Sequence, residues 1–399
     1  MITSTKTKLL LLLLLFCISS NAQVPKQPLF AGHPDRIKTL DSLIENAASL
    51  ALNKADYKHS LELAINAGTK SDSMITAVAV HFFSHLAYGN QPINLQYEGV
   101  RFKPTIYNVP ALVNDYVAHK SLNKLVGYFT NASKQVASIL ASLKTYRDST
   151  KKYGSKIELL EKAASDYRWL NAIMQENRII LVNIPSTQLR AYDFGKQVLN
   201  MKVIVGKLST PTSTLSSPIN KITINPYWMV PKSIATKEML PKIIQDISYL
   251  ETYHLQVLNT NYKVVNPNTI NWESYSEENF PFTIRQGTGC DNSLGVLKVE
   301  FDSPFGIYLH DTPEKALFAN ANRFYSHGCM RMEKPIEMGK WLLQNNTKAI
   351  DTIDFNKCYK DPAPKSIPVT LSTKLIVWYS LVDFDNNGNL KFYKNIYEK

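Results

Sequence analysis

The first half of the chain has the hydrophobic spacing of helices. Apolar residues recur every three or four positions over 37–44 and 61–67, and an apolar run that begins at Ile75 continues without Gly or Pro until Gly89. This spacing places apolar side chains on one face of a helix. Two further helices are expected over 122–143 and 157–170, and the Gly- and Pro-containing stretch 89–110 is expected to be an irregular connector.

After residue 178 the pattern changes to short runs rich in β-branched residues. Strands are expected at 178–184, 187–192, 198–205, 222–224, 306–309 and 374–379, with turns at 185–186 and 193–195. Such close spacing favours a β-sandwich over βαβ units. A polar, helical segment over 233–258 and an Asn-rich stretch to residue 280 interrupt these strands. Long insertions commonly form lids or binding loops, so we expect a lid here.

The two patterns together predict an α+β protein. A helical N-terminal scaffold (23–172) precedes a mainly β, sandwich-like domain (173–399), which contains the helical lid insertion at 233–280. The run from Asp383 to Gly388 begins like an EF-hand calcium loop, but Lys394 stands where that loop requires Glu. Asn387-Gly388 is therefore interpreted as a hairpin turn.

The first 22 residues have the composition of a secretory signal peptide. Two lysines precede an unbroken leucine run over 9–15, and small residues follow up to Ala22. The run is too short to cross a bilayer, which needs roughly 20 apolar residues. We expect cleavage after Ala22, export to the periplasm and no transmembrane segment in the mature chain. Cys17 would suit a lipid anchor, but Phe16 stands where a lipoprotein signal has a small residue.

The net charge limits the possible binding partners, and the cysteine count indicates how many thiols are free. The formal net charge is +12, which suits nucleic acid, an anionic membrane or an acidic polymer. Export argues against nucleic acid, and a solvated basic surface without a specific partner fits equally well. Removal of the signal leaves Cys290, Cys329 and Cys358. An odd number of cysteines in an exported chain predicts at least one free thiol.

Candidate nucleophilic chemistry centres on Cys329 in the run Ser326-His327-Gly328-Cys329-Met330-Arg331, with His310 upstream. A thiol is a strong nucleophile only as thiolate, and an imidazole is its usual base. Gly328 permits the tight backbone that exposes a nucleophile and aims amides at an oxyanion. Structural zinc needs four ligands in close pairs, which this sequence lacks, so neither a metal nor another cofactor is expected.

Four runs of this sequence, in this order, resemble the catalytic signature of the L,D-transpeptidases. They are Asn225-Pro226-Tyr227-Trp228-Met229-Val230-Pro231; Arg285-Gln286 with Asn292-Ser293-Leu294-Gly295; Tyr308-Leu309-His310-Asp311-Thr312-Pro313; and the run around Cys329. The stretch 178–397 thus resembles the YkuD-type catalytic domain, in the larger branch with an inserted capping subdomain. That branch often carries a peptidoglycan-binding domain in its helical half, but 121–170 is too short and too helical for one.

The resemblance implies a role for each site residue. Cys329 would be the nucleophile and His310 the general base, oriented by the main-chain carbonyl of Asp311. The amides of His327, Gly328 and Cys329 would form the oxyanion hole. Arg331, Tyr308 and Ser326 would shape the site, while Arg285, Asn292 and Trp228 would bind substrate.

Two of these roles have alternatives, and Cys290 has two possible interpretations. Arg331 could instead hold the motif turn through a salt bridge, and His327 could compete with His310 as the base. Cys290 is either a second thiol near the site or a loop residue, and we favour the loop interpretation.

The implied reaction is peptidoglycan cross-linking through a cysteine thioester, with release of D-alanine from a tetrapeptide stem. Such an enzyme would be a carbapenem target. The expected partners are stem peptides, together with wall-synthesis proteins that would dock on the helical half. Two alternatives stay open: an L,D-carboxypeptidase, in which water resolves the same thioester, and a non-catalytic wall-binding scaffold that retains the fold.

Overall fold

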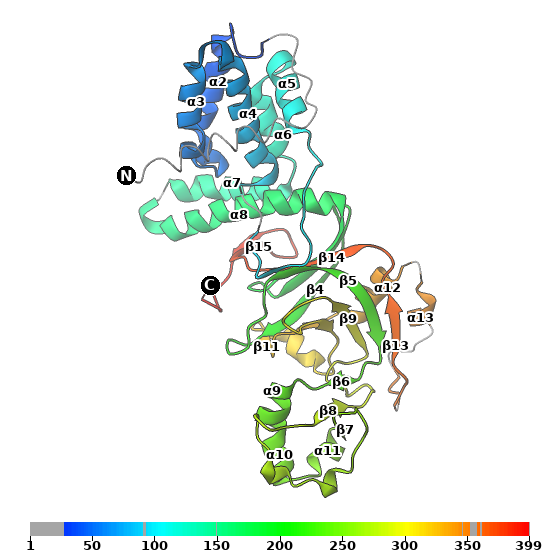
Figure 1. Ribbon diagram of the computed structural model, residues 1–399. Coiled ribbons are helices and arrows are strands. Elements are labelled where there is room, and N and C mark those ends of the chain that lie inside the picture. The colour runs from blue at the N-terminus through cyan, green and yellow to red at the C-terminus, as the bar shows by residue number, and fades with distance from the viewer. Residues whose placement is uncertain are drawn as a thin grey trace.

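The computed structural model describes residues 28–90, 93–148, 150–344, 346–351, 357–359 and 361–398. The expected signal peptide at 1–22, with Cys17, lies outside these residues. Three regions follow one another along the molecule: a helical bundle, a β-rich domain and a small lobe (Figure 1). In the described part of the chain, no helix has both the length and the apolar character needed to cross a membrane.

The helical bundle packs around its own apolar core, which includes Phe82, Phe83 and Leu125. Its helices are α2 (Pro34–Glu45), α3 (Lys58–Ile65), α4 (Ser71–Tyr88), α5 (Val109–His119) and α6 (Leu122–Thr130), with short 3-10 turns η1 (Ala47–Leu50), η2 (Lys54–Asp56) and η3 (Gly68–Lys70). The helices predicted over 37–44 and 61–67 and from Ile75 to Gly89 are confirmed. The single helix predicted over 122–143 is wrong, because α6 ends at Thr130 and Ser133 caps a new helix, α7 (Lys134–Arg147).

The long helix α8 (Thr150–Glu176) lies between the bundle and the β domain (Figure 1). It contains the helix predicted over 157–170. Its apolar face shares a core with the sheet, where the Tyr167 ring packs edge-on against Trp378 and Phe384 at centroid distances of 5.5 and 5.2 Å.

The β domain is built on a sheet that closes on itself. The strands pair in the order β1-β5-β14-β2-β3-β4-β12-β10-β9, and β5 also pairs with β9. Their bounds are β1 (Tyr97–Glu98), β2 (Arg178–Asn183), β3 (Gln188–Asp193), β4 (Lys196–Gly206), β5 (Leu215–Ile224), β9 (Leu297–Phe301), β10 (Leu309–His310), β12 (Met330–Met332) and β14 (Thr373–Trp378), with β11 (Phe324–Ser326) beside β4 and β13 (Lys365–Pro368) beside β5. The predicted α+β class is confirmed, and the sandwich-like sheet is joined into a ring by the β5–β9 pairing. An apolar core that includes Leu309, Met330 and Met332 belongs to this ring, next to α12 (Pro335–Leu342) and α13 (Lys348–Asp351).

The small lobe is inserted between β5 and β9. It contains a three-stranded sheet of β6 (Trp228–Met229), β8 (Thr283–Gln286) and β7 (Leu255–Leu258), with α9 (Lys232–Ile234), η4 (Ala235–Met239), α10 (Leu240–Gln245), α11 (Tyr249–Thr252), η5 (Pro267–Thr269) and η6 (Trp272–Ser274). A separate apolar core around Met239, Ile243 and Trp272 holds it together. The prediction of helix over all of 233–258 is wrong at its end, because 255–258 is strand β7 and pairs with β8.

The C-terminal run that resembles a calcium loop is a hairpin. β15 (Val382–Phe384) pairs antiparallel with β16 (Leu390–Phe392). Gly388 has a φ of +80°, which glycine adopts readily, and its amide donates to the carbonyl of Asp385 at 2.9 Å. The predicted hairpin is confirmed.

Candidate active site

The parallel pairing of β10 and β12 brings His310 and the Cys329 run together. Leu309 pairs with Met330 and His310 with Arg331. Leu309 and Met330 are fully buried in the core of the ring. Side chains alternate between the faces of a strand, so His310 and Arg331 project from the opposite face. Folding thus brings His310 beside Arg331, two residues beyond Cys329.

His310 is held in one orientation and one tautomer. Its side chain is buried, and Nδ1 lies 2.5 Å from the main-chain carbonyl oxygen of Asp311. A carbonyl only accepts hydrogen bonds, so Nδ1 carries the proton and Nε2 is the unprotonated nitrogen of the neutral ring. Burial and then the nearby Arg331 lower the pKa of His310 to about 3. The imidazole is therefore neutral, as a general base must be.

Asp311 is anchored by the loop that leads into β9. Its Oδ2 accepts from the amide of Val296 at 3.0 Å, and its own amide donates to the carbonyl of Leu297 at 2.8 Å. Oδ1 forms an ion pair with Lys315 at the start of η7 (Lys315–Ala319). These contacts fix the carbonyl that orients His310.

A tight turn presents Cys329. Gly328 has a φ of +112°, a conformation that L side chains rarely adopt. The buried Ser326 hydroxyl donates to the carbonyl of Cys329 at 2.5 Å and accepts from the Gly328 amide at 3.2 Å. Thr212, which the sequence did not single out, donates to the carbonyl of Gly328 at 2.8 Å. Because the Gly328 amide is directed at Ser326, the amides of His327 and Cys329 remain the predicted oxyanion donors.

Cys329 is a free thiol and is partly exposed. Burial raises its pKa, while hydrogen bonds from Tyr308 and the charges of Lys298 and Arg331 act in the opposite direction. With a neutral His310, the resting pair is an uncharged thiol and an uncharged imidazole. The proton must then leave sulfur as the sulfur attacks.

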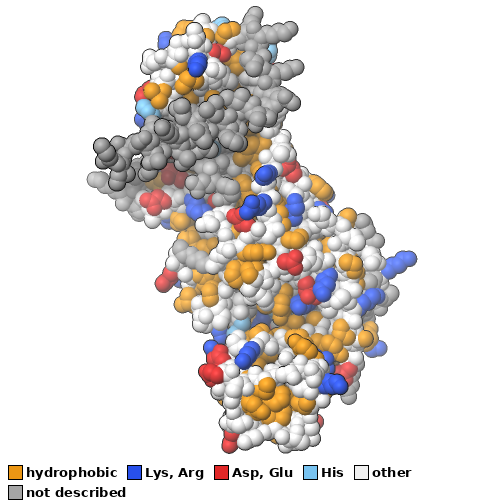
Figure 2. Space-filling view, viewed as in Figure 1, with side chains coloured by type: hydrophobic (Ala, Val, Ile, Leu, Met, Phe, Trp, Pro, Cys, Tyr) orange, Lys and Arg blue, Asp and Glu red, His pale blue; other side chains and the backbone are white. Residues whose placement is uncertain are grey.

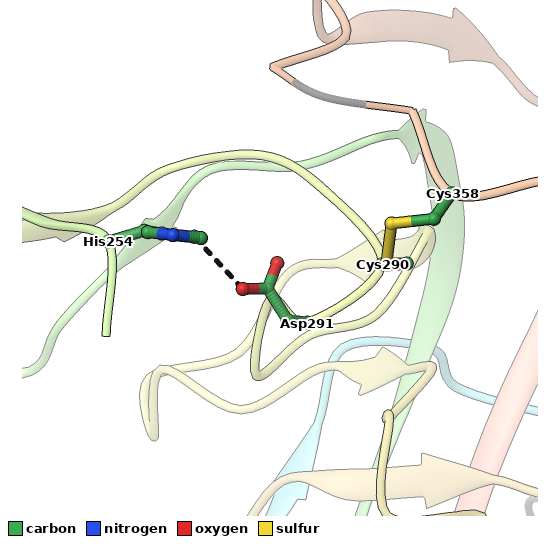
Figure 3. Close-up of a disulfide and its surroundings, with 4 residues drawn as sticks. All are labelled: His254, Cys290, Asp291 and Cys358. Atoms are coloured by element: carbon green, nitrogen blue, oxygen red, sulfur yellow. Dashed lines mark ion pairs between the residues drawn. A yellow bond between two sulfur atoms is a disulfide. The ribbon is translucent and has the colours of Figure 1, made fainter. Parts of the chain in front are cut away.

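The other two cysteines form a disulfide, Cys290–Cys358 (Figure 3). The prediction of at least one free thiol is confirmed by Cys329. Cys290 is not a second thiol near the site, which agrees with its interpretation as a loop residue. The disulfide itself was not predicted.

The side chains of Arg331 and His327 both interact with glutamates. Arg331 forms an ion pair with Glu314, which agrees with the alternative in which it holds the motif turn. His327 Nε2 lies 2.6 Å from Glu238 Oε1 on η4 of the lobe and 3.2 Å from Lys207 Nζ. His327 therefore connects the catalytic turn with the lobe, and His310 alone has a dedicated carbonyl on its ring.

Tyr308 interacts with the thiol, and Trp228 interacts with Tyr308. The Tyr308 side chain makes hydrogen-bond interactions with both Cys329 and Trp228, and burial raises its pKa. Its ring lies 5.6 Å from that of His310, and Lys298 Nζ lies 4.1 Å from its centroid. Trp228 belongs to β6, so the lobe contributes a side chain to the catalytic face.

The other two residues predicted to bind substrate are occupied within the protein. Arg285 stacks on Tyr227 at 4.4 Å and bonds Gln256 through Nε at 3.0 Å, so the lobe holds it. Asn292 is only 1% exposed, and its amide bonds the backbone of its own loop, at Gly287 and Leu294. Asn292 therefore braces its own loop in this structure, and its predicted contact with substrate stays a prediction.

Surface charge on the face shown in Figure 2 is mixed in sign. Lysine and arginine side chains are interspersed with aspartate and glutamate instead of gathering in one basic patch. Across the residues that the structure describes, no three His, Cys, Asp or Glu side chains are grouped as a metal site would require.

Comparison with known proteins agrees with this geometry. The family model of the L,D-transpeptidase catalytic domain, YkuD, matches residues 177–352. A Haemophilus influenzae (strain Rd) protein named "Putative L,D-transpeptidase" is 32% identical over 243 residues, which are 60% of this chain and 48% of that protein. The chain thus spans about half the length of this curated relative.

Two solved structures are similar to part of the chain. The catalytic domain of an Enterococcus faecium L,D-transpeptidase acylated by ertapenem is 11% identical, with 51% of this chain and 97% of that one covered and a TM-score of 0.25. L,D-transpeptidase 1 of Mycobacterium tuberculosis is 12% identical, with 50% and 60% covered and a TM-score of 0.22. On the family match, residues 177–352 of this chain are a YkuD-type L,D-transpeptidase catalytic domain.

Proposed function

We propose that this protein is a periplasmic peptidoglycan L,D-transpeptidase, with Cys329 as the nucleophile and His310 as the general base. The observation that supports this most directly is the β10–β12 pairing, which sets His310 beside Arg331, two residues beyond Cys329 in the chain. The Asp311 carbonyl supports the same assignment, because it leaves Nε2 as the proton acceptor.

In the proposed reaction, Cys329 attacks the carbonyl between the diamino acid and the terminal D-alanine of a tetrapeptide stem. Nε2 of His310 takes the thiol proton during attack, and the amides of His327 and Cys329 stabilise the oxyanion. The C–N bond breaks, D-alanine leaves with that proton, and a thioester remains. The amine of a neighbouring stem then attacks the thioester and gives its proton to His310. The new amide forms the cross-link, and the sulfur is reprotonated.

The inserted lobe is the proposed lid. Trp228 reaches the catalytic face, and the contact between His327 and Glu238 joins the lobe to the nucleophile turn. A lid that excludes water favours an amine acceptor over hydrolysis. The helical bundle is the proposed docking surface for wall-synthesis partners.

The test is acylation of Cys329 by a carbapenem, followed by mass spectrometry of the intact protein and its peptides. We expect one adduct, on Cys329, that is absent from Cys329→Ala and present in a Cys290→Ser/Cys358→Ser control. An unmodified wild-type protein would remove the enzymatic proposal. Incubation with disaccharide-tetrapeptides then separates the two outcomes of the thioester: cross-linked dimers indicate the transpeptidase, and trimmed tripeptides alone indicate the carboxypeptidase.

A further inference from the structure

A polar hollow of about 600 Å³ lies on the β domain, outside the site around Cys329. It forms where β12 ends and the edge of β4 continues without it. Four side-chain amides line it, those of Gln188, Gln197, Asn200 and Asn386. Asn200 Nδ2 donates to Asn386 Oδ1 at 2.7 Å, whereas the buried Asn200 Oδ1 has no hydrogen-bond partner among the described residues. A buried acceptor of this kind is stabilised by a ligand that donates to it.

The charged groups of the hollow balance one another. Lys202 and Lys334 contribute two ammonium groups, and Glu333 and Glu337 two carboxylates. Lys202 Nζ lies 3.9 Å from a Glu333 oxygen. A lining with no net charge favours a neutral ligand that both donates and accepts hydrogen bonds. Planar amides and carboxylates match vicinal hydroxyls and acetamido groups, and the apolar lining residues, such as Val198, can cover the C–H face of a sugar ring.

An added peptide strand fits the hollow less well. The outward backbone groups of β4 are already engaged, because Glu333 accepts from the Lys202 amide at 2.9 Å and Lys334 donates to the Asn200 carbonyl at 3.1 Å. The Glu333 amide also donates to the Lys202 carbonyl at 3.2 Å. A new strand would have to displace these contacts before it could pair with the edge.

The hollow lies further from the thiol than one stem can reach. Glu333, which lines the hollow, is four residues beyond Cys329 in the chain, and four extended residues at ~3.3 Å each span about 13 Å. In the proposed substrate, three residues separate the sugar from the bond that Cys329 attacks, and they span at most about 11 Å. The hollow would therefore hold a sugar further along the strand than the one that carries the stem.

We propose that this hollow is a glycan subsite, which holds N-acetylated amino sugars of the strand that carries the stem while the stem itself extends to Cys329. The inference rests on the proposed function for the identity of the glycan. It would give the chain a contact with the wall polymer that residues 121–170, expected to be too short and too helical for a peptidoglycan-binding domain, would not supply.

The test is a calorimetric titration of the full chain with the β-1,4-linked tetramer of N-acetylglucosamine, which has no peptide. We expect saturable binding to the wild type, weakened at least five-fold by Asn200→Leu and, as a second variant at a more exposed position, by Gln197→Leu. Asn261→Leu, an exposed amide on the lobe, is the matched control and should bind like the wild type. Carbapenem acylation of Cys329 should be unchanged in all three variants, which shows that each is folded.

Several results would overturn the subsite: no saturable binding by the wild type, equal weakening by Asn261→Leu, or competition by a sugar-free tetrapeptide stem, which would indicate a peptide groove. Failure of the proposed function looks different. There, Cys329 would not be acylated while the tetramer still bound in an Asn200-dependent manner, and the sugar site itself would be supported.

Discussion

Gly295 leaves no room for a side chain beside the residue that orients the base. Its φ is +60°, and a Cβ at this position would lie 2.3 Å from Asp311 Oδ2. We expect Gly295→Ala to destabilise the protein by about 3 kcal/mol, through backbone strain and displacement of the Asp311 carboxylate. Carbapenem acylation of Cys329 should slow as well, because the carbonyl that holds His310 moves.

Gly68→Ala is the matched control for this prediction. Gly68 has nearly the same φ, +58°, but nothing lies within 4 Å of its would-be Cβ. Gly68→Ala should therefore destabilise the protein only through the strain of an alanine in a left-handed backbone conformation, by about 1 kcal/mol. Urea unfolding of the two variants measures the difference, and equal losses would show that contact with Asp311 is not the cause.

The buried imidazole of His310 gives the protein an acid-sensitive stability. Its pKa is about 3 in the folded state and roughly 6.5 in an unfolded chain. Between these values the unfolded state binds more protons, so the free energy of unfolding falls as pH drops below about 6.5. From pH 6.5 to 5 we expect His310 to account for about 2 kcal/mol of this loss, at ~1.4 kcal/mol per pH unit.

Urea unfolding of wild type and His310→Gln at pH 7.5 and 5 measures this contribution. The variant should lose less stability between the two pH values by about that amount. His85, whose pKa burial lowers to about 4, acts with the same sign but is present in both proteins and cancels in the comparison. Identical pH dependence in the two proteins would contradict the assignment.

At the scale of elements, the loop between β8 and β9 connects the lobe to the base. Cys290 ties this loop to Cys358, and beside it Asp291 pairs with His254 at 2.9 Å (Figure 3). The same loop continues to Val296, whose amide holds Asp311. The disulfide thus braces a segment that reaches the orienting residue of the site.

The variant Cys290→Ser/Cys358→Ser should therefore loosen the loop. With a sequence separation of 68 between the cysteines, loop closure contributes at most about 4 kcal/mol to stability. We expect faster amide exchange over 287–296, measured by mass spectrometry, and little change in the helical bundle. A reductant should reproduce this in the wild type and leave the variant unaffected. Unchanged exchange would show that other contacts hold the loop.

Local patterns in the sequence predicted the elements better than the contacts between them. The spacing over 178–205 predicted β2, β3 and β4, and Gly328 predicted the tight turn, because these depend on neighbouring residues. The register of β10 on β12 depends on distant pairing, as does the Cys290–Cys358 disulfide. The bracing role of Asn292 in its loop was not predicted, because a buried loop brace and a substrate ligand can have the same residue type. Strand β7 was missed because its partner β8 lies 25 residues further on.

At the scale of the whole molecule, Asp383 joins three parts of the chain. It is fully buried and pairs with Arg190 of β3 at 2.9 Å. It also accepts from the Tyr167 hydroxyl of α8 at 2.8 Å and from Asn183 Nδ2 of β2 at 3.0 Å. Asp383, the first residue of the run that resembles a calcium loop, is thus a buried counter-ion where the helix meets the sheet.

Loss of this carboxylate should be costly. Asp383→Asn leaves Arg190 buried without its counter-ion, so we expect a destabilisation of about 3–5 kcal/mol in urea unfolding. Asp385→Asn, in the exposed turn of the same hairpin, is the control and should cost much less. Added calcium should leave the urea unfolding midpoints of both variants unchanged. A small loss in Asp383→Asn would show that the guanidinium is compensated elsewhere.

Helix α8 has a mechanical consequence. Its 27 residues span about 40 Å at ~1.5 Å per residue. One side of the helix packs against β14 and β15 in a shared apolar core. The bundle and the ring therefore tilt together, while the lobe is joined to the ring by the two segments that leave β5 and enter β9 and by side-chain contacts such as His327–Glu238. In the proposed function, a partner bound to the helical end would therefore set the angle at which Cys329 meets its substrate, and an opening for a glycan strand would come from movement of the lobe.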